Sequence, residues 1–166
     1  MTDMSATDIA TPTPAKEIRK PSSTEQIWSR EVTRHGYTGV PSILIRGQSR
    51  LGLNATQMNI ILQLLEYWVD PARKPFPSKK DLANRIGVKS GKTIQINIRA
   101  LEQAGFIRRE QRKTASGDWN SNIYHLDGLI SRVRELEPEF SEEKRKRADA
   151  RKTVETPKGR RTKAGL

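Results

Sequence analysis

The sequence from Pro77 to Gly105 constrains the fold more than any other part of the chain, because its pattern predicts two short helices joined by a tight turn. Ser78 has the side chain of an N-cap, and Leu82 and Ile86 give the first helix an apolar stripe. Gly87 is suited to end that helix, because a residue without a Cβ atom adopts the left-handed backbone conformation without strain.

The second helix of the pair is expected to begin after Ser90 and to run to Gly105, with Val88 filling the turn before it. Its apolar residues recur at three- and four-residue spacing and therefore share one face: Ile94, Ile98 and Leu101. The opposite face carries Lys92, Gln95, Ile96 and Arg99. Such a helix suits the major groove of DNA, because one side docks on the domain and the other offers hydrogen bonds to base edges and phosphates.

The run LANRIGVKSGKTIQINIRALEQAGFIRRE resembles the helix-turn-helix of winged-helix DNA-binding proteins. Those domains add two strands, and FIRREQRKT and SNIYHL are expected to form this hairpin, with TASGDWN as its loop. The preceding PFPSKKDLA is similar to the entry into this motif in bacterial regulators and in plasmid and phage replication initiators. The resemblance covers residues 51–126 and implies a mainly α fold with a small β-hairpin, a winged helix-turn-helix.

The residues expected to contact double-stranded DNA lie on the second helix and on the hairpin. They are Lys89, Ser90, Lys92, Thr93, Gln95, Ile96, Arg99, Arg108, Arg109, Arg112, Lys113 and Asn120. Gln95 can pair with adenine, Arg99 with guanine or a phosphate, and Ile96 suits a thymine methyl group. Two alternatives stay open: these side chains form only the solvated face of an amphipathic helix, and Thr93 faces the interior.

Alternation along a strand places Arg108 and Arg112 on one face of the hairpin and Arg109 and Lys113 on the other. Only one of these pairs can face DNA, and the other is expected to be solvated. Trp119, near the loop, is expected to pack on the domain rather than rest on a sugar, because an indole offers a large apolar area.

Charge is unevenly distributed along the 166 residues, whose net charge is +12. Residues 1–26 carry a net charge of −1, residues 27–140 a net charge of +7, and residues 141–166 a net charge of +6. The first segment is rich in Thr, Pro, Ser and Ala and is expected to be a disordered tail. Residues 27–140 are expected to form the folded domain with its flanking elements, and residues 141–166 a basic tail, partly helical or disordered.

Two apolar helices are expected to flank the central pair. One spans residues 55–69 with Asn54 as its N-cap, and its wide apolar surface fits either a core helix or one that also contacts a second copy. The other spans residues 128–136, capped by Asp127 and stopped by Pro138. A homodimer through both helices is therefore one expected assembly.

A short strand is predicted for Ile43 to Arg46, beside the hairpin. The residues that precede it, from Ile27 onward, contain several apolar side chains. They are expected to form an arm that packs on the domain or on a second copy.

No catalytic constellation, cofactor or metal site is expected. The segment GVKSGKT at residues 87–93 has one residue too few between its glycines for a phosphate-binding loop, and the residues before it are helical in pattern. The chain has no cysteine and only two histidines, His35 and His125. No apolar run is long enough to span a bilayer, so a cytoplasmic, nucleoid-associated protein without a small-molecule ligand is expected.

The leading functional hypothesis is a DNA-binding transcriptional regulator. The alternative is a replication or partition protein of a plasmid, phage or other mobile element that binds repeated origin sites, although the chain is short for a full initiator. A third hypothesis is a protein-interaction adaptor, for which Lys92 and Arg99 would be dispensable. RNA binding fits the basic charge, but few aromatic residues accompany the basic ones.

Overall fold

The computed structural model describes residues 20–112 and 121–155. Residues 113–120 of the expected hairpin lie outside the described residues. They include the whole predicted loop TASGDWN and the named residues Lys113, Trp119 and Asn120. The chain divides into two compact units, residues 1–37 and residues 38–166, and each is described by itself.

The first unit contains two short helices, α1 (Ser23–Trp28) and α2 (Arg30–Thr33), so α1 begins within the segment whose composition indicated a tail. A capping box starts α1: the Ser22 hydroxyl accepts from the backbone N–H of Glu25, and the Glu25 carboxylate accepts from the backbone N–H of Ser22. Large apolar side chains on both helices are exposed: Ile27, Trp28 and Val32.

The second unit begins with α3 (Ser42–Arg46), where the sequence predicted a strand over Ile43–Arg46. That prediction is wrong. An apolar run this short has no periodicity that separates a strand from a single helical turn. The described sheet has two strands, which pair with each other, and Leu44 instead uses the helical turn to reach the core.

Helix α4 (Ala55–Tyr67) is the central helix of the second unit. Asn54 caps it as predicted, in a capping box with Gln57. Four side chains along it are buried: Met58, Ile60, Ile61 and Leu64. The helix ends two residues earlier than predicted, and Trp68 is its C-cap.

Helices α5 (Lys79–Ile86) and α6 (Gly91–Gln103) form the predicted pair with its tight turn. The hydroxyl of Ser78 accepts a hydrogen bond from the backbone N–H of Asp81 at 3.0 Å, which completes the predicted N-cap. Gly87 ends α5 with a φ of 78°, in the left-handed region. Ser90 caps α6 by accepting from the backbone N–H of Lys92 at 3.1 Å.

The hairpin consists of β1 (Arg108–Glu110) and β2 (Ile123–His125), paired antiparallel with Arg109 opposite Tyr124. Tyr124 is fully buried, so the face that it shares with Arg109 is turned toward the domain. The backbone N–H of Tyr124 donates to the carbonyl of Pro75 at 2.8 Å, which fixes the hairpin to the loop before α5.

Two helices complete the unit, α7 (Asp127–Glu135) and α8 (Glu137–Glu155). Asp127 was expected to cap α7 but lies in its first turn, and the N-cap is Leu126, which makes no side-chain bond. Pro138 was expected as a stop; instead it lies in the first turn of α8, where its missing N–H costs no hydrogen bond. The chain therefore restarts a helix almost immediately.

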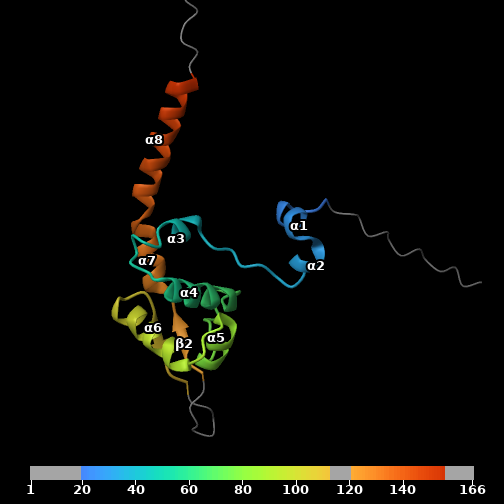
Figure 1. Cartoon of the computed structure of the whole chain (residues 1–166), viewed down its shortest axis with the longest axis vertical. Coiled ribbons are helices and arrows are strands. Elements are labelled where there is room, and N and C mark those ends of the chain that lie inside the picture. The colour runs from blue at the N-terminus through green and yellow to red at the C-terminus, as the bar shows by residue number, and fades with distance from the viewer. Residues whose placement is uncertain (1–19, 113–120, 156–166) are drawn as a thin grey trace, which may run out of the picture. The chain divides into compact units, whose positions relative to one another are not determined.

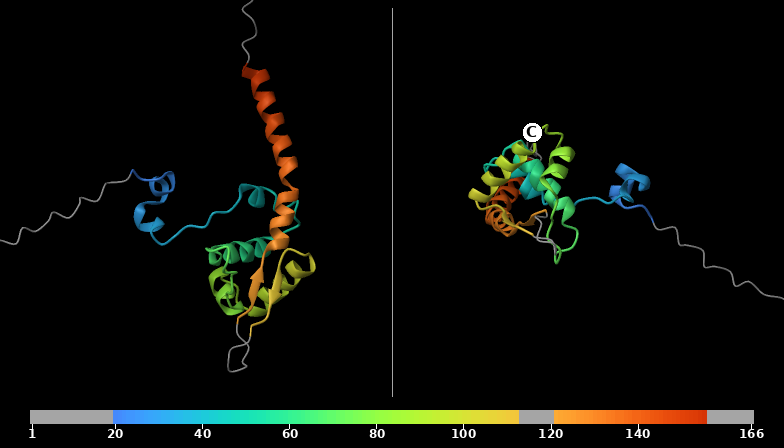
Figure 2. Two further views of the ribbon diagram at one scale, coloured as in Figure 1. Left: turned by 180° about the vertical axis from the view of Figure 1, so that it is seen from behind. Right: turned by 90° about the horizontal axis from the view of Figure 1, so that it is seen from below.

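The core of the second unit lies among α4, α5 and α6 and is closed by the hairpin and α7 (Figure 1). Fully buried side chains from different elements meet there: Ile60, Leu82, Ile94, Ile98, Tyr124 and Leu126. Within this unit, α8 extends on the side of α4 that faces away from the hairpin, as the view from behind also shows (Figure 2). Helix α6 contributes Ile94, Ile98 and Leu101 to this core, and its opposite, polar side lies outside the core.

Candidate nucleic-acid interface

Helix α6 has two distinct faces. The predicted apolar face is confirmed, since Ile94, Ile98 and Leu101 are buried. Most of the predicted contact residues around it are exposed: Lys89, Ser90, Lys92, Thr93, Ile96 and Arg99. Gln95 is half-buried. The alternative in which Thr93 faces the interior is wrong, because its side chain is exposed.

In addition to the cap at its start, α6 has polar contacts at Asn97, near its middle. The side-chain amide of Asn97 donates to the carbonyl of Thr93 at 2.9 Å. The amide of Asn54, at the start of α4, donates to the side-chain oxygen of Asn97 at 3.4 Å. A helix held in this way presents its exposed side chains from a defined position.

An ion pair connects the hairpin to α6. The guanidinium of Arg109 on β1 donates to the carboxylate of Glu102 through Nε at 2.7 Å and through Nη2 at 2.6 Å, and its backbone N–H donates at 3.2 Å. These hydrogen bonds to Glu102 raise the pKa of Arg109 above its usual value. Arg109 is thus paired inside the protein.

The other described arginines of the hairpin differ from Arg109. Arg108 is exposed on the outer face of β1. Arg112 is half-buried, and its guanidinium lies 5.4 Å from the centre of the Phe76 ring. Of the two arginine faces predicted for the hairpin, the one with Arg109 faces the domain. Arg108 points away from the domain, whereas Arg112 lies beyond the end of β1 and packs against Phe76. Lys113, the partner of Arg109 in that prediction, is outside the described residues.

A hollow of about 460 Å³ separates α6 from the hairpin and the start of α5. The predicted residues Gln95, Arg99 and Arg109 line it. Sequence reasoning did not place the seven other residues of its wall in the interface: Pro77, Ser78, Lys79, Gln111, Ser121, Asn122 and Tyr124. In the sequence, only their positions near the hairpin or near the start of α5 could have indicated that they belong to this site. Burial raises the pKa of the Tyr124 hydroxyl above its usual value.

Acidic side chains take little part in this interface. Asp81 is occupied by the α5 cap, where the Ser78 hydroxyl and then its backbone N–H hold the pKa of the carboxyl below its usual value. Across residues 20–112 and 121–155, no three His, Cys, Asp or Glu side chains gather as a metal site would require. None of the helices in those ranges is both long enough and apolar enough to cross a membrane.

Three packed helices followed by an antiparallel hairpin beside the third define a winged helix-turn-helix, which confirms the predicted fold. Residues 51–107 match the model of a protein family described as "Helix-turn-helix domain". This match indicates DNA binding, and it ends before the hairpin begins.

Solved structures with the same fold include the N-terminal domain of DnaD from Geobacillus kaustophilus HTA426. That domain is 21% identical, with a TM-score of 0.50, over 69% of this chain and 93% of its own. A possible transcriptional regulator from Methanosarcina mazei Go1 is 14% identical, with a TM-score of 0.41, over 66% of this chain and 85% of its own. MarR is 24% identical, with a TM-score of 0.36, over 81% of this chain and 96% of its own. No curated protein matches the sequence significantly.

Proposed function

We propose that this chain is a sequence-specific double-stranded DNA-binding protein and acts as a transcriptional regulator. The observation that carries the proposal is the division of α6 into a buried apolar face and an exposed face with Lys92 and Arg99. Such a helix can enter the major groove without unpacking its domain. The function requires no catalytic step or cofactor, and it would place the protein at the nucleoid in the cytoplasm.

Sequence preference is assigned to three side chains of α6. Gln95 would read adenine, Ile96 would contact a thymine methyl group, and Arg99 would pair with guanine or a phosphate. Ile96 supports this assignment, because an isoleucine that is 55% exposed on a polar face gains little from water and can gain from a methyl group. A good bidentate pair discriminates against the wrong base by about 1–3 kcal/mol.

Affinity is assigned mainly to phosphate contacts, which do not depend on base sequence. Lys79 at the start of α5, Lys89 in the turn and Arg108 on the outer hairpin face are exposed. All three make no ion pair with any described residue. The segment 156–166, with four basic residues and no acidic residue, would add further non-specific affinity.

A homodimer through residues 55–69 and 128–136 remains a proposal. Most apolar side chains of α4 pack within their own domain, which favours the core interpretation of that helix. Val69, just beyond its end, is 89% exposed and is the part of this segment most open to a second copy. A two-fold symmetric DNA site would support the dimer.

A replication or partition role on a mobile element is the alternative, and it rests on the likeness of PFPSKKDLA to the entry of the motif in initiators. The winged helix would then bind repeated origin sites. The arrangement of sites on DNA separates the two roles, because a dimeric regulator selects an inverted repeat and an origin-binding protein selects direct repeats.

The experiment that tests the proposal is selection of bound duplexes from a random DNA pool at near-physiological salt. We expect one sequence to be enriched. Arg99→Ala should relax the preference at one base position by about 1–3 kcal/mol. The matched control is Arg134→Ala, which removes an exposed guanidinium from α7, and it should leave the preference unchanged.

Absence of any enriched sequence would contradict sequence-specific binding. Equal effects of Arg99→Ala and Arg134→Ala on the preferred sequence would contradict the assignment to α6. Enrichment of single-stranded RNA over duplex DNA in a parallel selection would move the function to RNA.

A further inference from the structure

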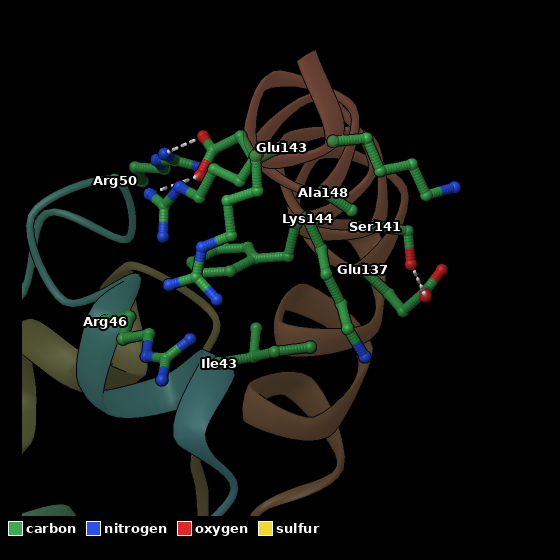
Figure 3. Close-up of a pocket in the computed structure, with 12 residues that line it drawn as sticks. Ile43, Arg46, Arg50, Glu137, Ser141, Glu143, Lys144 and Ala148 are labelled. Atoms are coloured by element: carbon green, nitrogen blue, oxygen red, sulfur yellow. Dashed lines mark hydrogen bonds and ion pairs between the residues drawn. The ribbon is translucent and has the colours of Figure 1, made fainter. Parts of the chain in front are cut away.

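A second basic surface lies at the other end of the unit that contains residues 38–155. A hollow of about 840 Å³ opens between α3 and α8 (Figure 3). We call it the α3–α8 groove, and its defining residues are Ile43, Arg46, Phe140, Lys144, Ala148 and Arg151. Figure 3 shows Ile43 and Arg46 on α3 facing α8 across this hollow.

The walls of the groove are held together by Arg50, which follows α3. Its guanidinium donates to Glu139 at 3.3 Å and to Glu143, and it lies 4.7 Å from the centre of the Phe140 ring. Gly47 lies so close to α7 and α8 that a Cβ atom there would be 2.7 Å from the side chain of Leu136. The groove is therefore a formed surface between packed elements.

Positive charge exceeds negative charge around the groove. Its wall contains six Lys or Arg residues and two Glu residues. Glu143 is already paired with Arg50 and Arg147. By contrast, Arg46, Lys144 and Arg151 form no ion pair with any described residue, and all three are exposed. Three cations are thus available to a ligand.

The bottom of the groove is apolar. Ile43 and Phe140 are both half-buried, so each still presents carbon surface to the hollow. A ligand that fills the groove must therefore offer carboxylates or other anions to the rim and an apolar group to the bottom. Peptide segments that combine acidic and large apolar side chains meet both requirements, and charge-assisted hydrogen bonds would hold them.

The DNA that is proposed to bind α6 does not suit the α3–α8 groove. No residue of α5, α6 or the hairpin lines the groove. Within this unit, α3 and α8 lie on the opposite side of α4 from the hairpin (Figure 1, Figure 2). Moreover, a phosphate backbone has no large apolar group to cover Ile43 and Phe140.

We propose that the α3–α8 groove binds an acidic segment of a partner protein. Carboxylates of that segment pair with Arg46, Lys144 and Arg151, and an aliphatic or aromatic side chain packs on Ile43 and Phe140. The site is separate from the proposed DNA interface, so both can be occupied at once.

The test is selection of peptides from a displayed random library on the full chain, followed by fluorescence anisotropy with the selected peptides. We expect peptides with Asp or Glu beside a large apolar residue. The variant Lys144→Glu with Arg151→Glu should weaken their binding by at least about tenfold, because two attractive contacts become repulsive. Arg99→Ala should leave peptide affinity unchanged, and saturation with duplex DNA should not displace the peptide.

The matched control is Arg145→Glu with Lys146→Glu, which makes the same charge change on the same helix at two residues that do not line the groove. It also removes the ion pairs of both residues with Glu142, which does not line the groove. It should change peptide affinity by less than about threefold, since toward the peptide it alters only the general electrostatic attraction. Circular dichroism of both variants would verify that α8 remains helical.

Three results would each overturn the proposal. One is selection of peptides without an excess of acidic residues. Another is equal weakening by the groove variant and the control. The third is a different occupant: a larger loss of DNA affinity for the groove variant than for the control would assign the groove to nucleic acid, and loss of self-association would assign it to a second copy.

Discussion

Arg109 on β1 and Glu102 on α6 are joined by two side-chain hydrogen bonds of 2.7 and 2.6 Å, so the hairpin and the helix proposed to read DNA are linked as one piece. Both side chains are about one quarter exposed, which leaves this pair partly shielded from salt. The contact fixes the angle between two surfaces that would have to meet the same duplex.

Breaking the ion pair between Arg109 and Glu102 should reduce the affinity for duplex DNA more than it reduces the free energy of unfolding. In a double-mutant cycle with Glu102→Gln and Arg109→Gln, we expect a coupling energy of about 1 kcal/mol in the free energy of unfolding. Duplex affinity should fall for Glu102→Gln although this change removes a negative charge, because the hairpin loses its fixed orientation. Urea unfolding and DNA titration measure the two effects. Higher affinity for Glu102→Gln would show that charge, rather than orientation, governs binding.

The contact between Gly128 and Gly105 should tolerate no side chain. A Cβ atom on Gly128 would lie 2.0 Å from the carbonyl oxygen of Gly105, and the neighbouring Leu129 N–H bonds the carbonyl of Phe106 at 2.8 Å. Gly128→Ala should therefore lower the free energy of unfolding by about 2–3 kcal/mol or more. Gly91→Ala is the control, since nothing lies within 4 Å of that position and alanine favours a helix. Similar unfolding midpoints for the two variants would contradict the close approach.

The capping box of α5 should contribute stability that depends on pH. Ser78→Ala should cost about 1 kcal/mol at neutral pH, because an N-cap hydrogen bond is lost. The folded pKa of Asp81 lies below its unfolded value, so its contribution is present above the unfolded pKa and is lost as pH falls through the folded pKa. The difference in unfolding free energy between the native chain and Asp81→Asn should therefore shrink below about pH 4. Urea unfolding from neutral to acidic pH tests this, and a constant difference would exclude Asp81 as the titrating group.

Removal of residues 156–166 should weaken binding to all duplexes alike. This segment holds four basic residues and no acidic residue: Lys158, Arg160, Arg161 and Lys163. Each phosphate contact that is lost should reduce the slope of log affinity against log salt by about 0.9. The cut falls beyond α8, so the contacts of Phe140 and Glu143 are retained. A change in the preferred base sequence after the cut would show that the segment reads bases.

Local chemistry made α4, α5 and α6 predictable. Asn54, Ser78 and Ser90 cap their helices through bonds to residues at most three positions away, and Gly87 supplies a left-handed turn. Apolar spacing then identified the buried face of α6, because a helix repeats at a fixed period. These signals are all contained within a few neighbouring residues.

Contacts between distant elements were not predictable in the same way. Sequence reasoning placed Arg109 among the DNA contacts but did not foresee its partner Glu102, because the pairing depends on how the hairpin packs on α6. The α3–α8 groove likewise joins residues about one hundred positions apart, such as Ile43 and Phe140. The helix at Ser42–Arg46 depends on the packing of Leu44 into the core. A short apolar run in the sequence does not specify that packing.

The two faces of α6 also differ in the substitutions that they tolerate: residues of the exposed face can be replaced with little effect on the core, and residues of the buried face cannot. Substitution of Ile94 or Ile98 by a smaller residue would open a cavity in the core, whereas Ile96 and Arg99 are exposed and lie outside the buried cluster. Under the proposed function, relatives of this chain could diverge in the DNA that they prefer while keeping one scaffold, and an engineer could retarget the protein by replacing only exposed residues. Evolution of specificity would then proceed with little loss of folding stability.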